Sequence, residues 1–221
     1  MYFRDRHDAG RQLAARLEQV GYGPRPDLLV LALPRGGVPV GAEVARALGA
    51  QLDVFLVRKL GLPGHEELAM GAVATGGIRV LNEDVVDALQ VPDSVIDEVA
   101  DRELRELERR EHAYRDDRPP PDVRDKTLIL VDDGLATGSS MRAAAKALQQ
   151  QAPKRLVVAA PVAAPQTCDA LRKEVDEIVC AITPDPFYGV GLWYQDFAQT
   201  TDDEVCTLLA QATQPTTRRA A

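Results

Sequence analysis

The segment from residue 128 to residue 151 constrains the fold most. An aliphatic run at residues 128–131 ends in two adjacent carboxylates, Asp132 and Asp133. A loop of small residues then leads into a helix-prone segment at residues 141–151. A short run without polar residues predicts a strand buried on both faces of a parallel sheet. Because ligands in open α/β sheets bind where such strands end, the same segment predicts the position of a site.

The loop after the two aspartates has the composition of a phosphate-binding turn. Thr137, Gly138, Ser139 and Ser140 offer backbone N–H groups and hydroxyls with little steric bulk. A helix start leaves donors unpaired and carries partial positive charge, which favours an anion. The aspartates would repel a phosphate, and about 5 Å apart they repel each other by roughly 3 kcal/mol at an effective dielectric constant of about 20. We therefore expect them to face a metal ion, sugar hydroxyls or a developing cation, as a phosphorylated sugar would provide.

Residues 131–140 resemble the phosphoribosyl-pyrophosphate (PRPP) signature of type I phosphoribosyltransferases. The shared pattern is two acids, two variable residues, then Ala or Asp followed by Thr-Gly and small hydroxyl residues. The resemblance implies that Asp132 and Asp133 are catalytic. It also implies that residues 136–140, beginning with Ala136, bind the 5′-phosphate. An acidic helix cap in an ordinary α/β protein is the alternative interpretation.

A second loop, Pro34-Arg35-Gly36-Gly37, follows another aliphatic run and precedes a helix-prone segment. It lacks the Lys-Ser/Thr of a Walker loop and the Gly-x-Gly-x-x-Gly of a dinucleotide-binding turn. By position it resembles the family's pyrophosphate loop, so Arg35, Gly36 and Gly37 are implied to bind pyrophosphate. The resemblance also implies a non-proline cis peptide between Pro34 and Arg35. A plain glycine turn is the alternative.

Two further segments enter through the same resemblance. Arg58 and Lys59 end a strand predicted at residues 52–57, and they resemble the Arg-Lys pair that faces pyrophosphate in adenine and orotate phosphoribosyltransferases. A solvated strand end is the alternative. Residues 61–71 are predicted to form a mobile loop that closes over the site, in which His65, Glu66 or Glu67 would carry a proton. A merely solvated loop is the alternative there.

Aromatic residues gather near the C-terminal end, at residues 184–197. This segment resembles the hood of purine phosphoribosyltransferases. Phe187 or Tyr188 would then stack on the base, and Asp196 would help Asp132 and Asp133 hold Mg²⁺, directly or through water or substrate. An aromatic mini-core or a dimer contact is the alternative.

The fold class expected is α/β, with an open, mainly parallel twisted sheet flanked by helices and a small hood subdomain. Residues 1–221 would form a single domain, with the hood drawn from about 1–25 and 184–200. A short hairpin is predicted about Gly76 and Gly77. The charged segment at about 93–117 is predicted as a helical insertion, either a solvated helix with one thin apolar stripe or an arm that binds a partner.

Composition limits the class of partner. The formal net charge of −8 disfavours a broad nucleic-acid surface. The aliphatic runs are too short to span a membrane, and the N-terminus has no apolar signal core. Three widely spaced cysteines fit a reduced, cytoplasmic protein. A homodimer is implied by the family resemblance alone.

The expected function is transfer of the 5-phosphoribosyl group from PRPP to a nitrogenous base, with release of pyrophosphate and dependence on Mg²⁺. Ala136 stands where hypoxanthine-guanine enzymes carry an acid, which disfavours a 6-oxopurine acceptor. Two alternatives remain: a regulator that senses PRPP or a nucleotide on the same fold, and a sugar-phosphate hydrolase.

Overall fold

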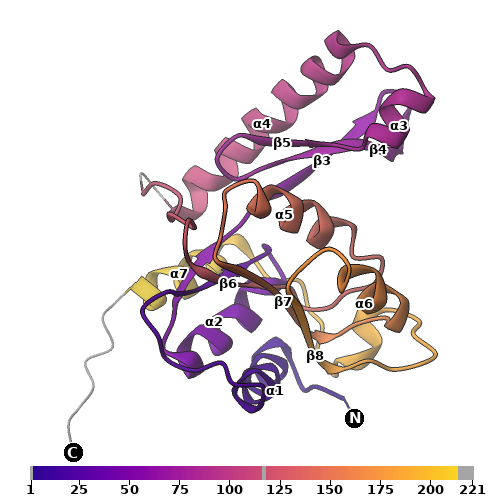
Figure 1. The fold of residues 1–221 in the computed structure, drawn as a ribbon. Coiled ribbons are helices and arrows are strands. Elements are labelled where there is room, and N and C mark those ends of the chain that lie inside the picture. Colours follow the sequence, from indigo (N-terminus) through magenta and orange to yellow (C-terminus); the bar gives the residue numbers. More distant parts are fainter. Residues whose placement is uncertain (1, 116–117, 214–221) are drawn as a thin grey trace, which may run out of the picture.

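The computed structural model describes residues 2–115 and 118–213. The first residue of the predicted hood, the last two residues of the predicted insertion and the end of the predicted domain lie outside the described residues. Figure 1 shows two stacked units, a helix-flanked sheet below and a smaller sheet with a long helix above. Among the described residues, no helix is both long and apolar enough to cross a membrane.

The lower unit is built on five parallel strands, which confirms the predicted fold class. The strands are β1 (Leu28–Ala32), β2 (Gln51–Val54), β6 (Thr127–Val131), β7 (Arg155–Val162) and β8 (Glu177–Ile182), in the spatial order β2-β1-β6-β7-β8. β1 and β6 are buried along their whole length, as their aliphatic sequences predict. Ala32 pairs with Val131 at the carboxyl ends of these two strands, so the loops that follow them leave the sheet side by side.

Helices cover both faces of this sheet. α1 (Arg6–Gln19) and α2 (Gly37–Leu48) pack on one face, and α5 (Ser139–Gln149) lies on the other with α6 (Pro165–Leu171) (Figure 1). α7 (Asp202–Thr213) packs against α2 and β2. α2 ends at Gly49, which adopts a left-handed conformation with φ of 62° and closes the helix.

The upper unit is an antiparallel sheet of β3 (Val57–Leu62), β4 (His65–Ala74) and β5 (Ile78–Leu81), followed by α3 (Glu83–Ala88) and α4 (Asp93–Arg115). Two predictions are wrong here. The strand expected at residues 52–57 stops at Val54, and the loop expected at residues 61–71 is mostly strand, with a tight turn at Pro63 and Gly64. The hairpin about Gly76 and Gly77 is confirmed.

The antiparallel sheet forms because both of its faces are covered. Leu60, Met70 and Val73 belong to the same core as α4, whereas Ala74, Val57 and Val80 pack with residues of α5. α5 therefore lies between the two sheets (Figure 1).

α4 carries the predicted charged insertion. Ile96, Val99 and Leu107 form the buried row of the helix, and most of its charged residues face solvent. At its end, Arg115 is only 2% exposed and binds Asp53 of β2, with Nε 2.8 Å from the carboxylate oxygen Oδ1. The helix is thus anchored to the edge of the parallel sheet.

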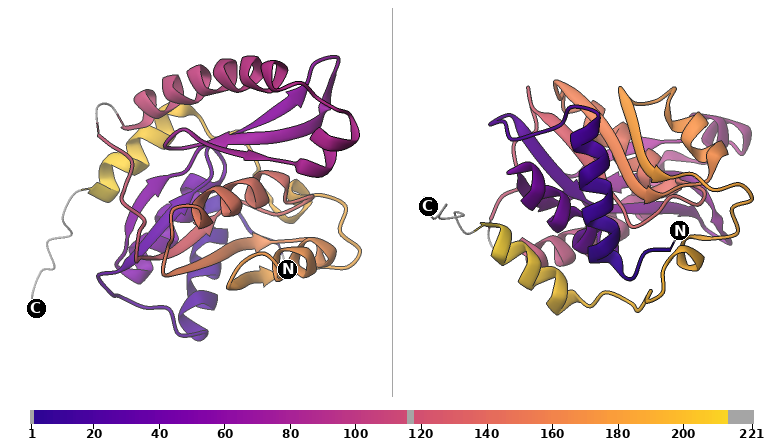
Figure 2. Two further views of the ribbon diagram at one scale, coloured as in Figure 1. Left: turned by 45° about the horizontal axis from the view of Figure 1, so that its top comes forward. Right: turned by 90° about the horizontal axis from the view of Figure 1, so that it is seen from below.

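The two segments predicted to form the hood meet in space. Phe3 forms a parallel bridge with Tyr194, just after the short helix η1 (Val190–Trp193). Phe3, Tyr194 and Val162 form a small core of their own. The right-hand view of Figure 2 shows the N-terminal segment beside this part of the chain.

Candidate active site

The two loops expected to carry the chemistry pack against each other at the carboxyl ends of β1 and β6. A Cβ atom on Gly37 would lie 2.8 Å from the carbonyl oxygen of Val131 and 3.0 Å from Cα of Asp132. A Cβ atom on Gly36 would lie 2.1 Å from Oδ2 of Asp133. Both contacts are closer than real Cβ atoms tolerate, so this approach of the loop to the acidic pair requires glycine at both positions.

Asp132 and Asp133 form a partly buried acidic pair. The backbone N–H of Asp133 donates to Oδ1 of Asp132 at 2.8 Å. Burial, followed by the neighbouring charge of Asp133, raises the pKa of Asp132 well above its ordinary value. Burial also raises the pKa of Asp133, although the Arg6 guanidinium opposes that effect. The pair is therefore placed where a bound cation or hydroxyl donors would lower its free energy.

Two residues that the sequence interpretation missed hold Asp133. Nε of Arg6 lies 2.8 Å from Oδ2 of Asp133, and both side chains are largely buried. The hydroxyl of Tyr194 donates to the backbone carbonyl of Asp133 at 2.5 Å, and burial raises the pKa of that phenol. In the sequence, Arg6 is one of several charged residues near the N-terminus, and Tyr194 is one of the clustered aromatics. Neither signal specifies a partner more than 60 residues away.

The predicted phosphate turn has the geometry that an anion needs. Gly138 is the residue before α5 and adopts a left-handed conformation with φ of 71°. Thr137, Ser139 and Ser140 are exposed to solvent, and the hydroxyls of Thr137 and Ser139 are 3.1 Å apart. The first N–H groups of α5 thus face an open turn lined by hydroxyls.

α6 supports this turn from behind. The Thr167 hydroxyl donates a hydrogen bond to the carbonyl oxygen of Ala136. A Cβ on Gly138 would lie 2.7 Å from Cγ2 of the same threonine, so glycine is required here for space as well as for conformation.

Arg35 lies in the second loop, where the peptide bond between Pro34 and Arg35 is cis, as predicted. Its Nη1 is 3.8 Å from Oδ2 of Asp202, a long and partly exposed ion pair. Residues 199–203 and Arg35 line a hollow of about 360 Å³. The Arg35 guanidinium therefore borders this hollow, and it belongs to the same loop whose glycines pack against the acidic pair.

Arg58 and Lys59 do not end a parallel strand, so the prediction of their place is wrong. Both lie within β3, where Arg58 binds Glu103 of α4 at 2.5 and 2.8 Å. Lys59 donates to the carbonyl oxygen of Glu67 on the adjacent strand at 3.2 Å. Within residues 2–115 and 118–213, neither makes an ion pair or hydrogen bond with the acidic pair or with residues 34–37.

His65, Glu66 and Glu67 begin β4 instead of occupying a long mobile loop. All three are exposed at the tip of the β3–β4 hairpin, and Glu66 accepts a hydrogen bond from the N–H of Gly64 at 3.2 Å. This hairpin points away from the parallel sheet (Figure 2). In this structure they are not gathered with the predicted catalytic residues.

The C-terminal candidates are separated by the structure. Phe187 is partly buried against the small core around Phe3, whereas Tyr188 is 80% exposed. Asp196 is exposed, and its carboxylate accepts the N–H of Ala198 at 2.9 Å. Among the described residues, no hydrogen bond or ion pair joins Asp196 to Asp132 or Asp133.

A magnesium ion fits the acidic pair only as an ion shared with substrate. In the described part of the chain, no three His, Cys, Asp or Glu side chains group into a metal site. Mg²⁺ typically uses one or two carboxylates, keeps several waters and takes further oxygens from substrate phosphates. Two adjacent carboxylates, one of them strongly disfavoured as an anion, meet that requirement.

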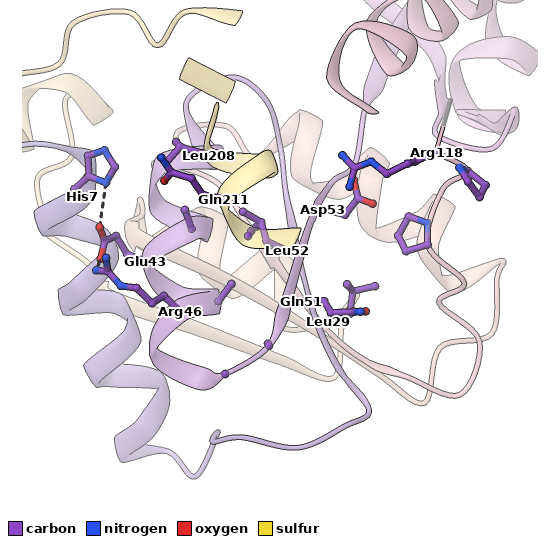
Figure 3. Close-up of a pocket in the computed structure, with 17 residues that line it drawn as sticks. His7, Leu29, Glu43, Arg46, Gln51, Leu52, Asp53, Arg118, Leu208 and Gln211 are labelled. Atoms are coloured by element: carbon purple, nitrogen blue, oxygen red, sulfur yellow. Dashed lines mark hydrogen bonds and ion pairs between the residues drawn. The ribbon is translucent and has the colours of Figure 1, made fainter. Parts of the chain in front are cut away.

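A second hollow, about 780 Å³, lies elsewhere, between α2, β2, α7 and residues 118–121 (Figure 3). Several of its charged groups are already paired: Glu43 binds His7 and Arg46, and Asp53 binds Arg115. None of the residues predicted for the site lines this hollow, and we assign it no chemistry.

Comparison with known proteins agrees with this geometry. The family model described as "Phosphoribosyl transferase domain" matches residues 4–195. Two proteins from two strains of Mycobacterium tuberculosis, provisionally named as phosphoribosyl transferases, are each 43% identical over 210 residues. That alignment covers 95% of this chain but 47% of each relative, so the chain spans about half their length.

A solved structure shows the same fold over nearly the whole length. The crystal structure of TT1426 from Thermus thermophilus is 43% identical in sequence, with a TM-score of 0.85. The alignment covers 96% of this chain and 99% of that one. With the family match across residues 4–195, this likeness shows that the chain belongs to the phosphoribosyl transferase domain family.

Proposed function

We propose that this protein transfers the 5-phosphoribosyl group from PRPP to a nitrogenous base and releases pyrophosphate, in a reaction that depends on Mg²⁺. One observation carries the proposal: an open, hydroxyl-lined helix start adjoins a partly buried acidic pair against which a glycine loop packs. A phosphate, ribose hydroxyls and a diphosphate would each have a matching surface there.

The 5′-phosphate would bind at residues 136–140. The N–H groups at the start of α5 and the hydroxyls of Thr137, Ser139 and Ser140 are its donors, and the partial positive charge of the helix start favours the dianion. Binding the phosphate at this fixed point would place the ribose over Asp132 and Asp133.

The acidic pair would act at the reacting carbon. As the bond from the anomeric carbon to the pyrophosphate oxygen breaks, its electron pair leaves with pyrophosphate and positive charge grows on the ribose ring. Asp132 and Asp133 would accept hydrogen bonds from the ribose hydroxyls and stabilise that charge. The lone pair of the acceptor nitrogen then forms the new carbon–nitrogen bond, and the proton that this nitrogen carried passes to solvent.

The pyrophosphate would leave along residues 34–37, where Arg35 borders the open hollow. Bound Mg²⁺ would neutralise part of its charge.

Arg58 is held by Glu103 and would need to break that ion pair to take part. Of the two aromatics proposed to stack on the base, Tyr188 is the exposed one. Ala136 stands where hypoxanthine-guanine enzymes carry an acid, and this disfavours a 6-oxopurine as the acceptor base.

The test is pyrophosphate release from PRPP and Mg²⁺ with a panel of purine and pyrimidine bases, and with no base. Release that requires one base supports the transferase and identifies its acceptor. Release without base would instead indicate a hydrolase. Binding of PRPP without turnover would favour a sensor, and absence of PRPP binding would overturn the proposal.

Variants make this test specific. Asp133→Asn should lower turnover by orders of magnitude with the fold intact, and Thr137→Ala combined with Ser139→Ala should mainly raise KM for PRPP. Asp101→Asn removes an exposed carboxylate on α4 and serves as the matched control. Normal turnover in Asp133→Asn would contradict the assignment.

The homodimer remains a prediction, which light scattering on the purified protein would test.

A further inference from the structure

Arg6 is held on three sides at the first turn of α1. Its Nε binds Oδ2 of Asp133 at 2.8 Å, and its Nη1 donates to the carbonyl oxygen of Ala198 at 2.6 Å. Its guanidinium carbon lies 4.0 Å from the centre of the Phe197 ring, close enough for a cation–π contact. Only 12% of the side chain is exposed. A guanidinium fixed in this way is a permanent charge of known position.

The two aspartates therefore differ in charge environment. Asp133 has a full counter-charge on Oδ2, and the backbone of Gly36 lies against the same oxygen. Asp132 has no ion pair with a basic side chain in the part of the chain that the structure describes, and its Oδ1 accepts a hydrogen bond from the N–H of Asp133. When both carboxylates are ionised, as they would be with a cation bound, the local sum of Arg6, Asp132 and Asp133 is one negative charge instead of two.

A divalent cation responds to this difference. A cation bound at Asp133 would lie close to the Arg6 guanidinium and would be repelled by it, because the energy of two like charges grows as their separation shrinks. Arg6 also acts on Asp132, but the two side chains make no ion pair, so the repulsion of a cation there is weaker. Oδ1 of Asp132 lies beside the Gly37 backbone, facing the loop proposed to bind pyrophosphate.

We propose that Arg6 is a positioning residue that divides the work of the two aspartates: Asp132 takes the divalent cation, and Asp133, neutralised by Arg6, is kept as an acceptor for ribose hydroxyls. The inference rests on the proposed function for the identity of the sugar. The cation preference itself follows from charges within this chain.

The experiment is a titration with Mn²⁺ as a probe for Mg²⁺, followed by electron paramagnetic resonance, with and without PRPP. We expect Asp132→Asn to weaken Mn²⁺ binding at least tenfold and Asp133→Asn to change it less than threefold. Arg6→Gln removes the charge and should strengthen Mn²⁺ binding severalfold, because it releases a second carboxylate. Arg6→Lys should restore the wild-type affinity.

Arg4→Gln is the matched control, since the Arg4 side chain is 69% exposed and pairs with Asp8 instead. It should leave Mn²⁺ binding unchanged. A general loss of structure at Arg6 would weaken binding in Arg6→Gln, which is the opposite of the expected sign. Comparison of Asp132→Asn with Asp133→Asn does not alter Arg6, so the proposal is still tested if Arg6→Gln does not fold.

Equal losses in the two aspartate variants, unchanged affinity in Arg6→Gln, or no Mn²⁺ binding by the wild type in either arm would overturn the inference. The Mn²⁺-only arm separates it from the proposed function. If the variants show the expected pattern of Mn²⁺ affinities but the protein does not bind PRPP, the division of the two aspartates stands and the transferase assignment fails. If the protein turns over PRPP but Asp132→Asn and Asp133→Asn lose Mn²⁺ affinity equally, the transferase assignment stands and the division fails.

Discussion

The backbone of Gly36 lies directly against the carboxylate of Asp133, so closely that a methyl group on residue 36 would sit 2.1 Å from Oδ2. This contact joins the proposed pyrophosphate loop to the acidic pair. It means that a change in one must displace the other.

Gly36→Ala should therefore disturb the site by moving Asp133 or the loop. We expect PRPP affinity to fall at least tenfold, measured by isothermal titration calorimetry. Gly23→Ala is the control, because a Cβ there would have no heavy atom within 4 Å. Wild-type affinity in Gly36→Ala would show that the loop and the acid move independently.

Tyr194→Phe should destabilise the protein through the lost hydrogen bond to the Asp133 carbonyl. The ring is buried, so an unpaired carbonyl beside it costs about 1–2 kcal/mol. For a chain of this length that lowers Tm by roughly 3–6 °C, measured by differential scanning calorimetry. Tyr188→Phe, at an exposed position, should leave Tm within error, and equal shifts in the two variants would argue against the hydrogen bond as the cause.

Stability should depend on pH through Asp132. Because burial raises the pKa of Asp132, the native state binds more protons than the unfolded chain between the ordinary value and the raised one. The free energy of unfolding then falls as pH rises through that window. Asp132→Asn removes this loss, so the variant should gain stability relative to wild type from pH 4 to pH 7.

Urea unfolding of both proteins across that pH range measures the difference. Asn can still accept the N–H of Asp133, so the main change is the charge. A difference that stays constant with pH, or that shrinks toward pH 7, would contradict the raised pKa. Gain of stability with loss of turnover would mark Asp132 as a residue kept for function at a cost in stability.

Arg115→Ala should be strongly destabilising. The guanidinium is nearly inaccessible and binds Asp53, Glu111 and the carbonyl oxygen of Val54. Removing one partner from such a buried network costs about 3–5 kcal/mol, which chemical denaturation can measure. Arg105→Ala, exposed on the same helix, should change the free energy of unfolding by less than about 0.5 kcal/mol.

The parallel sheet and the two central loops were predictable because their signals are local. The aliphatic runs of β1 and β6 end at residues whose small size and charge already indicate ligand binding. Because β1 and β6 are parallel and Ala32 pairs with Val131, the loops that follow these two strands lie together. The Pro34–Arg35 cis peptide was found through the family resemblance, since no local pattern indicates it.

The hairpin about Gly76 and Gly77 was predictable, but the strand β3 beside it was missed because its evidence is not local. Arg58 and Lys59 follow a hydrophobic run and so suggest a strand end, yet β3 is stabilised by a helix that begins more than 30 residues later. The partners of Arg6 lie 127 and 192 residues away in the chain. Charge and hydropathy at one position cannot specify contacts of that separation.

The link between Phe3 and Tyr194, with Arg6 spanning Asp133 and Ala198, has a consequence for how the molecule forms. Contacts between distant parts of a chain require the largest loss of conformational entropy, and they tend to form late. The acidic pair can therefore gain its counter-charge only when the N-terminal segment that carries Arg6 has docked beside it. Ligand bound at the acidic pair would in turn favour the docked state, so that substrate stabilises the folded protein as a whole.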